Sequence, residues 1–323
     1  SARNMTENAL LIPSPFSDTA LPRLVADAGP AAAFAWDEFF RGSIRNPHTR
    51  TAYSRAVRAL VAWLEDRRIP LAMVTPGMLG GYFDELGGSV PTKKLALAAI
   101  RRFYDALTLR HVVAFNPAAS VRGERYEVVE GKTPAISPDQ ARTLLGSIDA
   151  ATAAGVRDRA VIACLIYTAA RAGAVAKLRA KDFARDGTQY VLRFSEKGGK
   201  AREIPVRHDL ERYLLDYLAV AGMPAPATPL IRSLVRRTGA FTDRPMTGTD
   251  VWRMVKRRLK DAELPPQICP HSFRVATVTD LLSQGVPLAD VQYLAGHADP
   301  RTTRLYDRRD RAVSRNLVER ISI

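Results

Sequence analysis

Residues 270–306 read PHSFRVATVTDLLSQGVPLADVQYLAGHADPRTTRLY, and the rest of the chain is organised around this stretch. His271 and Arg274 lie three residues apart at the start of an apolar-periodic run, which places both side chains on one helix face. His297 follows a second helical pattern, and Tyr306 comes nine residues after His297. A guanidinium can hold phosphate oxygens, an imidazole can move protons, and a phenol can attack phosphorus. The order of these groups therefore suggests phosphoryl chemistry.

Two upstream segments extend the pattern. The sequence H-x-x-R, then G-H, then Tyr nine residues later resembles the tyrosine recombinase (phage integrase) family of Cre-like and Xer-like enzymes. Residues 168–171 read TAAR where that family reads T-G-x-R, and residues 196–206 read EKGGKAREIPV, which is similar to its G-K-G-x-K-x-R-x-x-P hairpin. These motifs stand in the family's order over about half of the chain. The resemblance implies six catalytic residues: Arg171, Lys197, His271, Arg274, His297 and Tyr306.

The resemblance also implies a reaction. Tyr306 would attack a DNA phosphodiester to give a 3′-phosphotyrosine and a free 5′-hydroxyl, while Arg171 and Arg274 stabilise the charge of the transition state. Lys197, the first lysine of the hairpin, would protonate the leaving oxygen. In the family, two such exchanges pass through a Holliday junction inside a tetramer, without a metal ion or cofactor. The expected activity is therefore site-specific recombination for integration, excision or resolution of DNA.

Two positions depart from the family pattern. Ala174 stands where an acidic residue usually follows the first arginine, and Val275 stands where a second histidine often follows the box arginine. Neither change removes a group that would touch the phosphate.

Two other functions remain open. A type IB topoisomerase would share this chemistry but would relax supercoils as a monomer, and the helical N-terminal block and the C-terminal tail favour the recombinase. A non-cleaving DNA-binding regulator would be expected to lack Tyr306 or one of the arginines, and the sequence keeps them.

Composition points to a polyanionic partner. The 323 residues carry a net charge of +15 and 46% hydrophobic residues, which together indicate a folded protein that binds nucleic acid. No run of 18 apolar residues is present, so no membrane partner is expected. The two cysteines, Cys164 and Cys269, lie far apart, which predicts no metal site and a reduced cytoplasmic location. The N-terminus shows no signal peptide pattern.

Hydrophobic periodicity predicts a mainly α-helical chain with two domains. We expect a flexible arm over residues 1–28, a helical core-binding (SAM-like) domain over 29–117, a linker over 118–136, and a catalytic domain with a C-terminal tail over 137–323. The catalytic domain would be mostly helical with one small antiparallel sheet, and the two domains would form a clamp around DNA. Helices are predicted over 32–42, 51–66, 75–86, 89–109, 137–145, 156–170, 210–220, 249–260, 272–284 and 288–294, and strands over 190–194 and 203–206.

Basic residues near helix starts and on helix faces predict the DNA contacts. In the first domain these are Arg50, Arg55, Lys93, Lys94, Arg101 and Arg102, and in the second Lys200, Arg202, Arg253, Lys256 and Arg257. The expected partner is double-stranded DNA with an inverted-repeat site. The apolar stripe of the tail, residues 311–323, would dock on a neighbouring subunit and give a homotetramer on paired sites.

Overall fold

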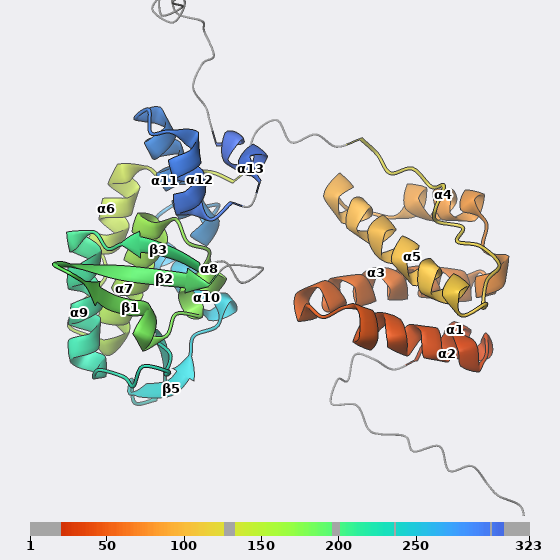
Figure 1. Cartoon of the computed structure of the whole chain (residues 1–323), viewed down its shortest axis with the longest axis horizontal. Coiled ribbons are helices and arrows are strands. Elements are labelled where there is room, and N and C mark those ends of the chain that lie inside the picture. Colours follow the sequence, from red (N-terminus) through yellow and green to blue (C-terminus); the bar gives the residue numbers. More distant parts are fainter. Residues whose placement is uncertain (1–20, 126–132, 196–200, 236, 298, 307–323) are drawn as a thin grey trace, which may run out of the picture. The chain divides into compact units, whose positions relative to one another are not determined.

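The computed structural model describes residues 21–125, 133–195, 201–235, 237–297 and 299–306 (Figure 1). The chain divides into two compact units, Ser1–Glu127 and Val128–Ile323, and each has a hydrophobic core of its own. Within the described ranges, no helix is long and apolar enough to cross a membrane.

The first unit is built from helices alone within its described residues. Its elements are α1 (Arg23–Asp27), α2 (Pro30–Asp37), a π-helix η1 (Glu38–Ser43), α3 (Pro47–Asp66), a 3₁₀ turn η2 (Leu71–Met73), α4 (Pro76–Glu85) and α5 (Val90–Leu109). Proline stands in the first turn of α2, α3, α4 and α5, where its missing N–H costs nothing. The side chains of Asn46 and Thr75 accept backbone N–H bonds and so fix the starts of α3 and α4.

An aromatic cluster fills the core of the first unit. The rings of Trp36 and Phe40 meet edge-on with centroids 4.7 Å apart, and Trp36 meets Phe103 of α5 at 5.6 Å. Two segments expected outside this domain also pack here. Val25 of α1, from the predicted arm, and Ala118, from the predicted linker, are both fully buried in this core.

The second unit mixes helices with short strands. Its helices are α6 (Pro138–Gly146), α7 (Ala153–Thr168), α8 (Ala172–Ala176), a 3₁₀ turn η3 (Ala180–Asp182), α9 (His208–Ala221), α10 (Gly248–Asp261), α11 (Pro270–Ser283), α12 (Leu288–Ala295) and α13 (Pro300–Arg304). Its strands are β1 (Phe183–Asp186), β2 (Gln189–Ser195), β3 (Ala201–Pro205), β4 (Arg232–Leu234) and β5 (Phe241–Pro245). The helix predictions hold to within a few residues, whereas α8, α13, β1, β4 and β5 were not expected.

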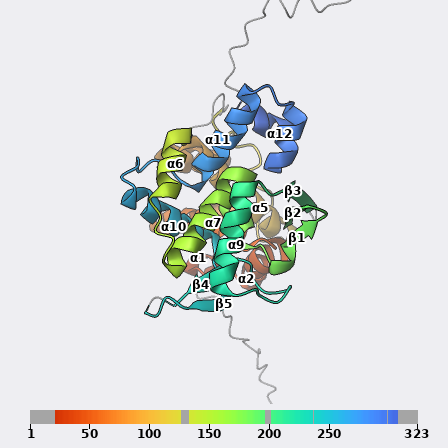
Figure 2. The same ribbon diagram turned by 90° about the vertical axis from the view of Figure 1, so that its left-hand side faces the viewer.

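Helix α7 is the central element of this unit. Six successive residues, 160–165, are fully buried, as the nearly unbroken apolar sequence predicts. Helices α6, α9, α10 and α11 surround it, and α11 and α12 gather at one end of the unit (Figure 2). The antiparallel sheet has the order β1-β2-β3, with Phe183 opposite Leu192 and Phe194 opposite Arg202. The strands β4 and β5 form a separate antiparallel pair.

Candidate active site

Arg274 lies at the centre of the site. Its side chain is buried on α11, and its guanidinium donates to the carbonyl oxygen of Ala169 at 2.6 Å. Ala169 ends α7 in a left-handed conformation, with φ at 50°, which costs a residue with a Cβ about 1–2 kcal/mol. Thr168 holds the turn, since its hydroxyl donates to the carbonyl of Cys164 and accepts from the N–H of Ala170. The turn therefore directs a backbone carbonyl at Arg274.

Arg171 follows this turn directly. It is the N-cap residue of α8 and its side chain is exposed. Two glycines allow α8 to lie against the start of α10, because a Cβ added to Gly248 would stand only 3.3 Å from the Cα of Gly173. The end of α7 thus places Arg171 on the surface and gives Arg274 its backbone acceptor.

Tyr306 lies between the two predicted histidines. Its hydroxyl is 3.2 Å from Nε2 of His271, and its ring stacks on that of His297 with centroids 5.7 Å apart and an interplanar angle of 3°. Tyr306 is 8% exposed and His297 is 6% exposed. Nδ1 of His297 is 2.8 Å from the hydroxyl of Thr303 on α13. The structure therefore brings together the histidines and the tyrosine that the spacing suggested.

The local electrostatics keep both imidazoles neutral near neutral pH. Burial, followed by the nearby charges of Arg274 and Arg171, lowers the pKa of His297 to about 3. The same causes lower the pKa of His271 below its ordinary value. A neutral His271 with a lone pair on Nε2 can accept the proton of the Tyr306 hydroxyl.

The predicted lysines of the hairpin cannot be placed. Lys197 and Lys200 lie outside the described residues, between the end of β2 at Ser195 and the start of β3 at Ala201. The tail residues 311–323 also lie outside the described range.

Arg202 does not occupy the surface position that a DNA contact would need. It is 3% exposed, and its guanidinium donates to the carbonyl oxygens of Thr168, at 3.3 Å, and Leu294. It also lies over the ring of Phe194, 4.8 Å from the centroid. The reason is strand alternation, because β3 turns Arg202 and Ile204 to the same buried face.

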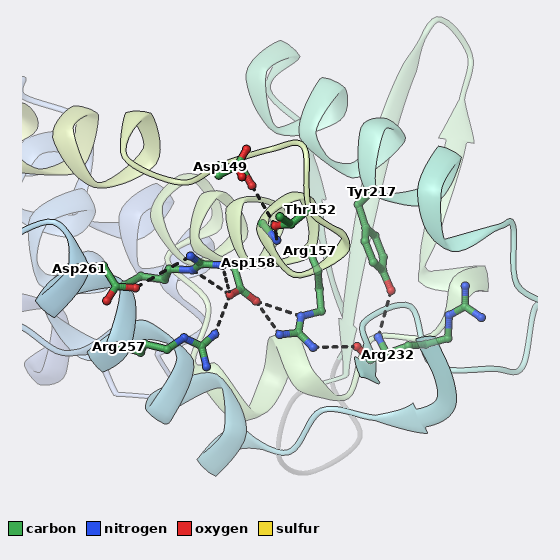
Figure 3. A network of polar contacts seen from close by, with 10 residues as sticks. Asp149, Thr152, Arg157, Asp158, Tyr217, Arg232, Arg257 and Asp261 are labelled. Atoms are coloured by element: carbon green, nitrogen blue, oxygen red, sulfur yellow. Dashed lines mark hydrogen bonds and ion pairs between the residues drawn. The ribbon is translucent and has the colours of Figure 1, made fainter. Parts of the chain in front are cut away.

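Helix α10 directs only part of its positive charge outward. Arg253 is exposed, as a DNA contact would require. Lys256 instead donates to the carbonyls of Pro266 and Ile268 in the loop before α11. Arg257, 54% exposed, donates to the carboxylate of Asp158 at 2.9 Å (Figure 3).

Asp158 is an interior anion that the sequence analysis did not single out. It is 0% exposed on α7 and accepts hydrogen bonds from Arg157, Arg257 and Arg258 (Figure 3). A buried carboxylate needs such partners, because an unpaired buried charge is strongly unfavourable. The sequence signal was an acidic residue between two arginines, Arg157 and Arg159, near the start of a helix whose other residues are mostly apolar. Asp158 therefore ties α7 to α10.

The predicted DNA contacts of the first unit fall into two groups. Arg55, Lys94 and Arg102 are exposed. The other three are partly buried and donate to carbonyls of their own unit: Arg50 to Ile44, Lys93 to Phe83, and Arg101 to Ala118 and Val121.

No group of three or more histidine, cysteine, aspartate or glutamate side chains that could hold a metal ion exists within the described ranges.

The sequence of the second unit matches a known family along most of its length. The profile described as "Phage integrase family" matches residues 134–312, more than half of the chain. The chain belongs to the phage integrase family. As a member of this family it is a tyrosine recombinase, a site-specific recombination enzyme. A second profile, "Phage integrase, N-terminal SAM-like domain", matches residues 37–111, within the first unit.

Similar proteins agree with this assignment. The tyrosine recombinase XerD of Ralstonia nicotianae is 28% identical over 275 residues, covering 82% of this chain and 84% of that protein. The tyrosine recombinase XerC of Pelobacter propionicus is 29% identical over 267 residues, covering 81% and 84%.

Solved structures share the fold. A lambda integrase dimer bound to a COC′ core site gives a TM-score of 0.63 at 19% identity, over 88% of this chain and 79% of that one. XerH recombinase bound to difH substrate gives 0.62 at 20% identity, over 81% and 76%. The predicted fold class, a helical SAM-like domain followed by a mostly helical integrase domain with a small antiparallel sheet, is confirmed, and the β4–β5 pair adds a second small sheet that was not predicted.

Proposed function

We propose that this recombinase cleaves and rejoins DNA through a covalent bond between Tyr306 and a 3′-phosphate. The observation that carries the proposal is the geometry around the phenol: the hydroxyl of Tyr306 lies 3.2 Å from Nε2 of His271, while His297 stacks on its ring. Arg274 and Arg171 are close enough to His271 and His297 for their charges to lower the pKa of both imidazoles, and Arg274 donates to the carbonyl oxygen of Ala169, two residues before Arg171.

Each residue has one task in the cleavage step. Tyr306 gives its phenolic proton to His271, and its oxygen bonds to phosphorus as the bond from phosphorus to the 5′-oxygen breaks. Arg171 and Arg274 bind the non-bridging oxygens and stabilise the charge that builds on them, an effect worth about a thousandfold in other phosphoryl-transfer enzymes. His297 donates a hydrogen bond from its neutral ring to the same phosphate. Lys197 protonates the departing 5′-oxygen, because an alkoxide leaves poorly.

The products allow rejoining without a second energy source. The phosphotyrosine conserves the energy of the broken ester, so a 5′-hydroxyl from another strand can reverse the step. Two such exchanges, through a Holliday junction, recombine two sites. We propose a homotetramer on paired inverted-repeat sites, assembled through the tail at residues 311–323, in the cytoplasm.

The proposed roles of the two domains in DNA binding use the domains expected from the sequence. The core-binding domain, expected over 29–117, and the catalytic domain, expected over 137–323, would form a clamp around the duplex, with Val25 and Ala118 packed in the core of the first of them. Its phosphate contacts would come first from the exposed cations: Arg55, Lys94, Arg102 and Arg253. Lys200 would hold a backbone phosphate beside the hairpin turn.

The experiment distinguishes recombination from relaxation alone. A random-sequence duplex library is incubated with the protein in excess chelator, and covalent adducts are recovered and sequenced. A pair of recovered sites is then placed on one supercoiled plasmid. We expect strand-exchange products, which the Tyr306→Phe variant does not form although it binds the same duplex. Relaxed plasmid without exchange products would instead indicate a topoisomerase, the function that the relatives described above do not favour.

A further inference from the structure

We infer that Arg202 is a positioning residue of the strand-cleavage reaction rather than a DNA contact. Its guanidinium joins three segments, each next to a residue of the proposed site. We call this set of contacts the Arg202 clasp: the guanidinium of Arg202, the carbonyl oxygens of Thr168 and Leu294, and the ring of Phe194. The inference rests on the proposed function of Tyr306.

Each contact of the clasp has a defined place in the chain. Thr168 is the last residue of α7 and comes three positions before Arg171. Leu294 lies near the end of α12 and comes three positions before His297. Phe194 is opposite Arg202 in the pairing of β2 with β3, the two strands that flank Lys197 in the sequence. The two carbonyls that Arg202 contacts belong to residues 34 and 92 positions away in the sequence. One side chain therefore holds together distant segments that carry the site.

The burial of Arg202 fits a positioning role better than it fits a contact with a DNA phosphate. The residue is 3% exposed, and a guanidinium removed from water needs acceptors close by. Two backbone carbonyls and the face of an aromatic ring supply favourable partners. A DNA phosphate would have to take the place of these contacts.

The charge of Arg202 also acts electrostatically on the site. Arg202 is among the charges that lower the pKa of His297, together with Arg274, Arg171 and His271. Removal of the Arg202 charge should therefore raise the pKa of His297, whereas removal of a surface arginine should not.

The test compares Arg202→Met and Arg202→Lys with the matched control Arg193→Met. Arg193 lies on the same hairpin, half-exposed and paired with Glu203 at 2.6 Å. Single-turnover adduct formation is measured at saturating concentrations of a duplex recovered with the wild-type protein. Arg202→Met should react about a hundredfold more slowly, the loss expected when a catalytic group is misplaced by about 1 Å. Arg202→Lys, which keeps the charge but not the forked geometry, should recover part of this rate, and Arg193→Met should react normally.

Two further measurements separate positioning from binding and from misfolding. A lost phosphate contact would lower the slope of log affinity against log salt by about one, so we expect no change in slope for Arg202→Met on a duplex of arbitrary fixed sequence. NMR titration of the labelled histidines, with His297 assigned from a His297→Gln variant, should show the raised pKa in a protein that remains folded.

The inference is overturned if Arg202→Met reacts at the wild-type rate, or if its salt slope falls while its saturated rate is unchanged. A wild-type protein that forms no adduct on any duplex would contradict the proposed function and not the clasp. The clasp would then be judged by the His297 signal, which should move in Arg202→Met and stay in Arg193→Met. An unmoved signal in Arg202→Met would overturn it.

Discussion

The site combines two positively charged arginines with two neutral histidines. Burial, followed by the positive charge of two arginines, lowers the pKa of His271 and of His297, so both imidazoles stay unprotonated at neutral pH. In the proposed cleavage step the neutral form suits His271, since that step needs a proton acceptor beside the Tyr306 hydroxyl. Thr303, which contacts Nδ1 of His297, fixes the orientation of that ring.

The lowered pKa of His297 predicts a pH-dependent stability. In the unfolded chain a histidine has a pKa of about 6.5, whereas the folded value is about 3. The unfolded state therefore binds the extra proton between these values, so stability is full above about pH 6.5 and falls as the pH drops toward 3, by at most about 1.4 kcal/mol per pH unit.

Urea unfolding of the wild type and of His297→Gln at several pH values checks this expectation. The wild type should lose more stability than the variant between neutral and mildly acidic pH, since only it carries the histidine. Equal losses in both proteins would show that His297 titrates normally in the folded state.

At the level of elements, periodicity predicted the long helices, because their apolar positions recur over several turns. It missed α8 and α13, since five residues are too few to show a period. The motif spacing predicted which residues meet at Tyr306, but it did not predict which groups the arginine side chains contact. The signal for the burial of Arg202 was present in strand β3, where strand alternation puts Arg202 and Ile204 on the same face. No local pattern shows that Lys256 turns toward the carbonyls of the loop before α11.

The pairing of Asp158 with arginines of α10 gives a prediction about the packing of that helix against α7. Asp158→Asn should destabilise the protein by about 3–5 kcal/mol, because it leaves buried positive charge without its anion. Arg157, which is 8% exposed, would bear most of that effect. Asp216→Asn is the matched control, since Asp216 pairs with Arg159 at 3.1 Å but is 45% exposed, and it should cost at most about 1 kcal/mol. Thermal unfolding of both variants gives the comparison, and equal shifts in Tm would contradict the account.

At the level of the whole molecule, the two units have separate cores and match separate profiles of one family. The net charge of +15 gives the chain the electrostatic attraction that a DNA-binding enzyme needs. Recognition of DNA and chemistry on DNA are therefore assigned to one chain, in which the residues of the proposed cleavage step come from the second unit.

The identity of the nucleophile tests the central claim most directly. The wild-type protein is trapped on a duplex recovered from the library, the DNA is digested to a short remnant, and the tryptic peptides are analysed by mass spectrometry. We predict that the nucleotide is attached to the tyrosine of the peptide that starts at Leu305, after Arg304, and therefore contains Tyr306. Attachment to Tyr293, which is 60% exposed on α12, or to any other residue would contradict the account.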